Sequence, residues 1–424
     1  MRKTFNRKGR EERRKGREAF SDTAFFACFA KALAYFAVKS FLTVTLGAQP
    51  SEVSDMRIDV ILVAVSVVCL SAFRCGGASS GGGTSIATPT ISSKAALNGA
   101  VIVSLSEASP GALIYYTLDG STPTGSSQRY QAPFLVARSL TLKAIAITRV
   151  ASSPVATQAF VLNIPSGTLV WSDEFSNSSG TIAQPDPATW TYDTGNSGFG
   201  NKELETYCAW GSNASPCSNA KHSQYVGTDG YLHIVAQRPS SGVYTSARMK
   251  TQGLFSFQYG RFEVRAMVPE AQGFWPAAWL LGNNIVTVHW PACGEMDVME
   301  RVNAASKPDW NAGSIHGTGF TGGEGLGRNY NFPAGQNAAQ WHTYGMIWSP
   351  GSIAYYVDNP AAPYVSFTPA KLTGLAKAVW PFDDGQSSFI ILNLAIGGTW
   401  PGPPDASAPF PSEMLVDYVR IYAN

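Results

Sequence analysis

Residues 260–269 read GRFEVRAMVP, and their apolar side chains alternate with charged ones. Phe262, Val264, Ala266 and Val268 fall at every second position, and arginine or glutamate fills most of the places between them. A period of two is that of a β-strand with one face in a core and the other toward solvent. The segment therefore predicts a strand in an antiparallel sheet.

Similar runs recur through the C-terminal two-thirds of the chain, and glycine, proline or asparagine turns separate them. They are YLHIVAQ (231–237), HTYGMIWSP (342–350), SIAYYVD (352–358), SFIILNLAIGG (388–398) and LVDYVRIY (415–422). No long helical stripe interrupts them. We expect an all-β fold in which residues 168–424 form one two-sheet sandwich of the β-jelly-roll type.

A smaller β module is expected to precede this sandwich. Residues 86–165 contain the strand-like runs VIVSL (101–105), ALIYYTL (112–118), LTLKAIAI (140–147) and AFVLNI (159–164). They predict a small β-sandwich behind a flexible Gly/Ser linker at residues 76–85. The module shows no convergent acids or histidines, which favours a spacer over a weak sugar-binding role.

Residues 1–75 form a basic N-terminal region with two interpretations. The first takes Met56 as the true start, with residues 1–55 as upstream sequence. Met56 is followed by an apolar run at 60–73, whose length suits a signal-peptide core, and then by Cys75 and the linker. This order resembles the start of a bacterial lipoprotein, although Arg74 occupies the place of a small residue. The alternative is a membrane anchor that begins at Met1. Both predict a protein that is secreted or held at the surface of a bacterial envelope, and both leave lipidation of Cys75 open.

The cysteines, histidines and charges indicate the compartment of the protein and the kinds of ligand that it binds. Cys208 and Cys217 flank the loop CAWGSNASPC, which predicts a disulfide of an exported protein, with two free thiols as the alternative. The five histidines are scattered, which argues against a transition-metal site. Residues 75–424 carry 18 basic and 22 acidic side chains without a basic patch. We therefore expect a neutral ligand and no nucleic acid.

The segment WPACGEMDVMERVN (290–303) places three acids in six positions. On a regular strand Glu295 and Asp297 share one face, whereas Glu300 points into the core, where an unpaired carboxylate is costly. One extra residue, inserted as a β-bulge at Val298 or Met299, returns Glu300 to the face of the other two acids. The irregular spacing therefore predicts a bulged strand.

This geometry is typical of a glycosidase. The bulge leaves the Cα atoms of Glu295 and Glu300 about 13 Å apart, and their side chains close the gap to roughly 5 Å. A retaining pair of carboxylates needs about that separation, whereas an inverting pair needs roughly 6.5–9.5 Å. Asp297 would help keep the acid/base protonated. The alternative is a solvated polar face, but Trp275, Trp279 and Trp290 close by favour a sugar cleft.

GEMDVME resembles the E-[ILM]-D-x-x-E signature of glycoside hydrolase family 16, in its laminarinase type. Met296 stands where isoleucine or leucine is usual, a mild exchange. The similarity extends to LVWSDEF, WTYDTGNSGFGNKELETY, YTSARMKTQGLFSFQYGRFEVR, FWPAAWLLG, GSIHGTGFTGG, WHTYGMIWSPGSIAYYVD and LNLAIGGTWPG. In the smaller module, PGALIYYTLDGSTPT resembles the chitobiase/hexosaminidase C-terminal-like modules.

The resemblance implies roles for individual residues. Glu295 would be the nucleophile, Asp297 its assistant and Glu300 the general acid/base. The residues implied to line the cleft or to bind donor-side sugars are Trp275, Trp279, Trp290, Arg248, Asn201, His316 and Trp400. An ordinary salt bridge or loop hydrogen bond is the alternative for Arg248 and His316. Glu203 fits either role, and His342 is expected to be structural.

The resemblance also implies the substrate. We expect a monomeric, secreted endo-β-1,3-glucanase that acts on β-glucan polysaccharide, without a cofactor for catalysis and with membrane attachment only through the N-terminal region. One structural Ca²⁺ near Glu174 and Asp417 is a further expectation. The alternatives are mixed-linkage glucan, galactan or transglycosylation on the same fold. A non-catalytic glucan-binding protein is disfavoured because both glutamates are present.

Overall fold

The computed structural model describes residues 85–302 and 309–424. Residues 1–84 lie outside this part. They include Met56, Cys75 and most of the linker, so the predictions for the N-terminal region concern residues that the structure does not describe. The chain divides into two units, Met1–Ser79 and Ser80–Asn424, and every described residue belongs to the second. No helix in the described part is long and apolar enough to cross a membrane.

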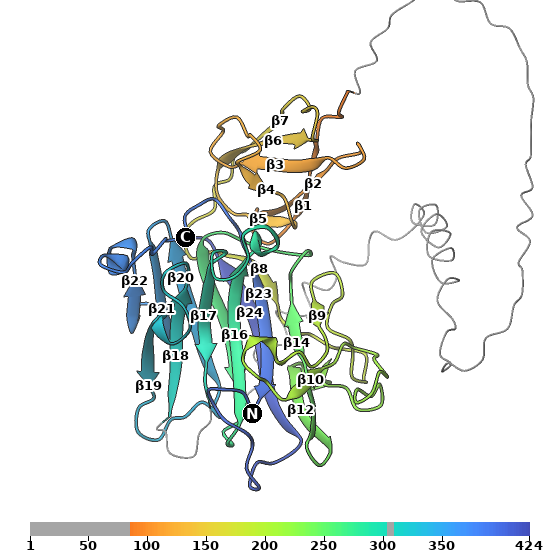
Figure 1. Cartoon of the computed structure of the whole chain (residues 1–424), viewed down its shortest axis with the longest axis vertical. Coiled ribbons are helices and arrows are strands. Elements are labelled where there is room, and N and C mark those ends of the chain that lie inside the picture. Colours follow the sequence, from red (N-terminus) through yellow and green to blue (C-terminus); the bar gives the residue numbers. More distant parts are fainter. Residues whose placement is uncertain (1–84, 303–308) are drawn as a thin grey trace, which may run out of the picture. The chain divides into compact units, whose positions relative to one another are not determined.

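The accessory module contains two small antiparallel sheets (Figure 1). One has the order β1 (Thr90–Ala95), β2 (Val101–Ser106) and β5 (Phe134–Val136). The other has the order β4 (Gln128–Arg129), β3 (Leu113–Thr117), β6 (Leu140–Ile147) and β7 (Ala156–Phe160). Buried residues of both sheets, among them Val103, Tyr116, Phe134 and Leu142, form the core of the module.

The larger domain is a sandwich of two sheets. Its seven-stranded sheet has the order β19 (Leu326–Asn331), β18 (Trp310–His316), β17 (Glu295–Glu300), β16 (Phe274–Gly282), β23 (Ser388–Ile396), β14 (Arg248–Lys250) and β9 (Thr191–Asp193). Strand β17, which carries the acidic segment, lies near the middle of this sheet, between β16 and β18.

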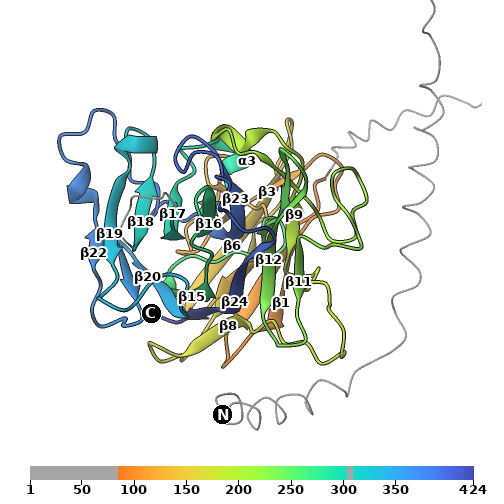
Figure 2. The same cartoon turned by 90° about the horizontal axis from the view of Figure 1, so that it is seen from below.

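The second sheet has ten strands. Its main path is β10 (Glu205–Tyr207), β13 (Val243–Ser246), β12 (Leu232–Ser240), β24 (Ser412–Tyr422), β15 (Gly260–Met267), β20 (His342–Ser349), β21 (Ser352–Val357) and β22 (Val365–Phe367). In addition, β11 (Gln224–Val226) pairs with β12, and β8 (Leu169–Asp173) pairs with β24. Figure 2 shows the two layers, with β17, β16 and β23 in one and β20, β15 and β24 in the other.

Strand β15 shows how the sequence pattern builds the core. Phe262, Val264 and Ala266 are fully buried between the sheets, as their alternation predicts. Glu263, on the other face, is also buried, but it accepts a hydrogen bond of 2.6 Å from the Tyr356 hydroxyl and pairs with Arg261 at 3.0 Å. Its charge is therefore compensated.

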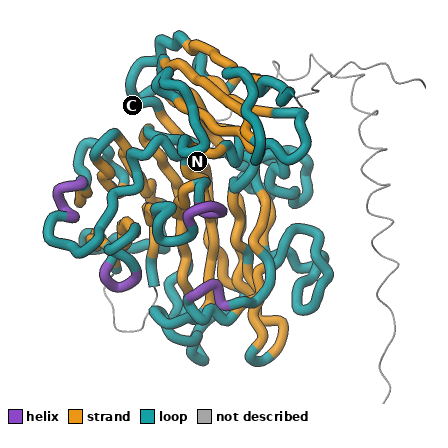
Figure 3. The backbone as a smooth tube through the Cα atoms, turned by 45° about the horizontal axis from the view of Figure 1, so that its top comes forward, coloured by secondary structure: helices purple, strands orange, loops and turns teal. Residues whose placement is uncertain are grey.

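Helical segments are short and few within the described residues (Figure 3). They are η1 (Gly198–Gly200), α3 (Ile285–Val288), η2 (Gly322–Glu324) and η3 (Pro369–Leu372). The expected all-β architecture, a jelly-roll sandwich behind a small β module, is confirmed. The expected disulfide joins Cys208 to Cys217, and Cys293 is a buried free thiol.

We predict that Val264→Ala lowers the free energy of unfolding by about 2 kcal/mol, because it removes two buried carbon groups worth roughly 0.8 kcal/mol each. Urea denaturation measures this. The matched control is Val161→Ala, since Val161 is 90% exposed. It should change stability by less than about 0.5 kcal/mol. Equal effects of the two changes would contradict the placement of β15 in the core.

Candidate active site

A β-bulge in β17 brings the three acids to one face. Trp279 on β16 lies opposite Asp297, but the next residue, Ala278, lies opposite Met299. Val298 is thus the extra residue, and the register of β17 with β18 shifts in the same interval. The side chains of Met296, Val298 and Met299 all belong to the core cluster. The bulge predicted at Val298 or Met299 is confirmed.

Two tryptophans donate hydrogen bonds to the two glutamates. The indole nitrogen of Trp290 lies 2.8 Å from Oε2 of Glu295, and that of Trp275 lies 3.0 Å from Oε1 of Glu300. Trp290 lies in the loop between β16 and β17, whereas Trp275 comes from β16. An indole N–H donates but does not accept, so each ring fixes one carboxylate oxygen of its glutamate.

Asp297 lies between the glutamates and is almost fully buried. The Ser314 hydroxyl donates to its Oδ2 at 2.7 Å, and Nε2 of His316 lies 3.2 Å from the same oxygen. His316 also lies 3.9 Å from Oε1 of Glu295. The ligand atoms of Glu295, Asp297 and His316 all fall within 4.8 Å of one another. The imidazole of His316 is thus placed among the acids.

Burial and mutual repulsion raise the pKa values of both glutamates. Desolvation and the charge of Asp297 raise the pKa of Glu295 to about 8, against the lowering influence of His316 and Trp290. Desolvation and the charges of Asp297 and Glu295 raise the pKa of Glu300 well above its usual range. Burial works to lower the pKa of His316, but the hydrogen bond and charge of Asp297 outweigh it and raise this pKa to about 9. Burial and the neighbouring charges therefore favour the protonated form of Glu300.

Arg248 lies beside Trp279 at the edge of this acidic group. Its guanidinium lies 4.7 Å from the centre of the Trp279 ring and 5.1 Å from that of Phe199. Its Nε also pairs with Asp193 at 2.9 Å. The charge of Arg248 lowers the pKa of Glu295. Arg248 is thus in an ion pair, and it also contributes a positive charge to the site.

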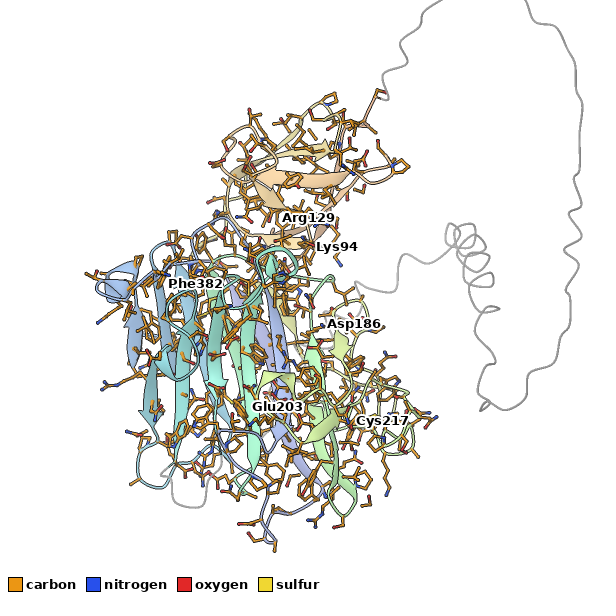
Figure 4. The ribbon with its side chains drawn as sticks, in the orientation of Figure 1. Lys94, Arg129, Asp186, Glu203, Cys217 and Phe382 are labelled. Atoms are coloured by element: carbon orange, nitrogen blue, oxygen red, sulfur yellow. A yellow bond between two sulfur atoms is a disulfide. The ribbon has the colours of Figure 1, made fainter. Side chains whose placement is uncertain are left out.

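A chain of hydrogen bonds leads from Asn201 to Trp279. The Asn201 amide donates to Glu203 at 3.0 Å, and the Tyr207 hydroxyl donates to Glu203 at 2.8 Å (Glu203 is labelled in Figure 4). The Asn393 amide donates to the Tyr207 oxygen at 3.3 Å, and Trp279 donates to Asn393 at 2.7 Å. Asn201 therefore connects through buried side chains to the strand opposite Asp297.

Trp400 extends the aromatic lining next to Glu300. Its ring lies 5.6 Å from that of Trp275, edge to face, and 5.9 Å from that of Trp310. Trp400 is 41% exposed and Trp290 is 46% exposed, so both offer ring surface to a ligand. Most of the predicted site residues thus gather at one face of the seven-stranded sheet. They are the three acids, Trp275, Trp279, Trp290, Trp400, Arg248 and His316.

The sequence pattern missed some residues of this site. Ser314 precedes His316 by two residues on β18, so strand alternation could have placed both on one face. Asn393 contacts Trp279 from β23, and Trp310 contacts Trp400 from β18. These two contacts join positions distant in sequence, so no local signal indicated them.

Glu174 and Asp417 lie elsewhere, on and beside the ten-stranded sheet. Arg420 binds Glu174 with two hydrogen bonds of 2.9 Å, and Arg265 binds Asp417 at 2.7 Å. Within the described residues, neither acid belongs to a group of three acidic, histidine or cysteine side chains with metal-ligand spacing. Both carboxylates are thus paired with arginines, and a structural Ca²⁺ near them stays a prediction.

Comparisons with known proteins agree with this geometry. The family model of glycosyl hydrolases family 16 matches residues 209–418, and that of the chitobiase/beta-hexosaminidase C-terminal domain matches residues 92–157. The chain is 38% identical over 268 residues to a beta-glucanase of Rhodothermus marinus, covering 61% of this chain and 86% of that protein.

Solved structures show the same likeness. The laminarinase catalytic domain from Thermotoga maritima is similar with a TM-score of 0.52 and 36% identity, over 61% of this chain and 98% of that one. The endo-beta-1,3-glucanase from Pyrococcus furiosus is similar with a TM-score of 0.52 and 37% identity, over 60% of this chain and 94% of that one. The chain therefore belongs to glycosyl hydrolase family 16.

Proposed function

We propose that this glycoside hydrolase is a secreted endo-β-1,3-glucanase that cleaves laminarin-like glucan with retention of anomeric configuration. The observation that carries the proposal is the shared face of Glu295, Asp297 and Glu300, with a tryptophan donor on each glutamate. The β-glucanase and laminarinase names of the relatives support the substrate.

In the first step, the Glu295 carboxylate attacks the anomeric carbon, and the bond from that carbon to the glycosidic oxygen breaks. Glu300 gives its proton to the departing oxygen, and a covalent glycosyl-enzyme remains. The raised pKa of Glu300 suits this role because an acid must hold its proton at the working pH. Trp290 keeps one oxygen of Glu295 in place during the attack.

In the second step, Glu300 is an anion and accepts a proton from water, which attacks the same carbon from the side that the leaving group occupied. Glu295 departs as a carboxylate, and Glu300 regains its proton. Two inversions give net retention. Burial and Asp297 raise the pKa of Glu295, but His316 and Arg248 oppose this rise and so favour the anion as both attacking and leaving group.

We predict that Glu295→Gln lowers the rate of reducing-sugar release from laminarin on the order of 10⁴-fold, because an amide cannot attack. The control is Glu413→Gln, since Glu413 pairs with His233 at 2.7 Å on the other sheet. Lichenan and agarose, assayed in parallel, test the substrate. The proposed activity is wrong if the intact protein releases no sugar from laminarin, and the assigned nucleophile is wrong if the variant keeps its rate.

Glu300→Gln should separate the two steps. With laminarin we expect a loss of roughly 10²–10⁴-fold, because the leaving sugar needs a proton. The second substrate is an aryl β-laminaribioside, whose phenolate leaves without needing a proton. With it the first step should stay fast in the variant, and the rate of this step should no longer decline at high pH. Stopped-flow release of the phenol measures that rate. An equal loss with both substrates would contradict the role of Glu300 as acid.

His316→Gln should move the acid limb of the kcat profile to higher pH by roughly one unit. The His316 cation lowers the pKa of Glu295, so its removal raises that pKa, and a higher pH is then needed to ionise the nucleophile. The profile is measured with laminarin from pH 4 to 10. His222→Gln, on a histidine that stacks on Trp210, is the control and should leave the limb in place. A shift to lower pH would refute the charge assigned to His316.

A further inference from the structure

The accessory module is bonded to the catalytic domain through backbone and side chain. The amide of Leu135, on β5, donates to the carbonyl of Ser256 at 2.9 Å, and Phe134 and Ser256 form a parallel β-bridge. The side-chain amide of Gln128, on β4, donates to the carbonyl of Asp384 at 2.6 Å. In the catalytic domain, Ser256 lies between β14 and β15, and Asp384 lies just ahead of β23.

The two parts also share a hydrophobic core. Ala100, Ile102 and Leu135 of the module belong to the same buried cluster as the catalytic sandwich. The cluster there includes Trp171 and Phe255, whose rings stack at 4.4 Å. A module on a free tether keeps a polar surface, so this burial is the mark of a fixed interface.

A chain of buried polar groups continues from this interface into the catalytic domain. The Ser256 hydroxyl lies 3.0 Å from the carbonyl of Pro133 in the module and 3.0 Å from the Ser387 hydroxyl. The side-chain amide of Asn283 donates to the same Ser387 hydroxyl at 3.0 Å, and its backbone amide donates to the Ser387 carbonyl at 2.9 Å. Ser256, Ser387 and Asn283 are all buried.

This chain of hydrogen bonds ends one residue beyond the cross-strand pairs of β23, β16 and β17 that include Glu295. Ser388 lies opposite Gly282 in the sheet, and Leu281 lies opposite Glu295. Asn283 begins the loop 283–294 that joins β16 to β17 and carries Trp290, the hydrogen-bond donor to Glu295.

The segment ahead of β23 also packs on the residue before Glu295. A Cβ added at Gly294 would lie 2.9 Å from Pro381 and 3.0 Å from Phe382, so a larger residue there would collide with this segment. The module therefore contacts segments that reach both ends of the loop 283–294. Through Ser256 and Ser387 it is linked to Asn283, and through Asp384 it contacts the segment that packs on Gly294.

We propose that the accessory module is a positioning element of the active site. Through Gln128, Leu135 and the buried Ser256–Ser387–Asn283 chain, it holds the loop 283–294 and with it the Trp290 indole against Glu295. The partner of this face of the module is the chain's own catalytic domain. The inference goes beyond the proposed function and replaces the spacer role that the sequence favoured.

The test is amide hydrogen exchange of the full chain without substrate, read by mass spectrometry, so the result does not depend on the proposed activity. Gln128→Ala removes one interface hydrogen bond, and Leu135→Ala removes interface packing. The matched control is Gln158→Ala, because Gln158 is exposed on β7 of the same module.

We expect both interface variants to speed exchange in peptides that span residues 281–294 by several-fold, with the larger effect for Leu135→Ala, and to lower kcat on laminarin more than they change KM. Gln158→Ala should change neither. Faster exchange confined to residues 86–165, or equal over the whole described chain, would overturn the proposal. So would an effect of Gln158→Ala that matches that of Gln128→Ala.

Discussion

Three carboxylates share one face of β17, where Asp297 is buried and the two glutamates are half-buried, and the rest of the site compensates for that arrangement. Removing an acid from water is costly, and like charges nearby add to the cost. The response differs at each position: Trp275 and Trp290 donate to the outer acids, and Ser314 and His316 donate to the central one. Burial, together with the remaining repulsion from Asp297 and Glu295, raises the pKa of Glu300, which is the property a general acid requires.

The bulge at Val298 makes this arrangement compatible with a packed sandwich. Without it, Glu300 would enter the core between the sheets. With it, Met296, Val298 and Met299 all pack inside, and the acids stay on the opposite face. One extra residue thus satisfies the hydrophobic core and the site at the same time.

Much of this could be predicted from local patterns. The period of two in residues 260–269 predicts β15, and the spacing of the acids predicts the bulge, because both follow from how a strand alternates. The pattern predicts the tryptophans only as cleft lining, because it does not show that Trp275 and Trp290 donate hydrogen bonds to the glutamates. The arginine partners of Glu174 and Asp417 come from other positions in the sheet, and no local spacing indicates them.

The sequence of the accessory module contains no signal for how the module attaches to the catalytic domain. Its strand runs and turns predict its own fold, but its attachment depends on Leu135 and Gln128 meeting residues more than one hundred positions away. The shared core also bears on how such a chain arises by recombination. A module joined only by a tether can be exchanged between enzymes at the level of whole gene segments. Here an exchange would expose apolar residues on both parts, so the module and the domain are expected to be inherited together.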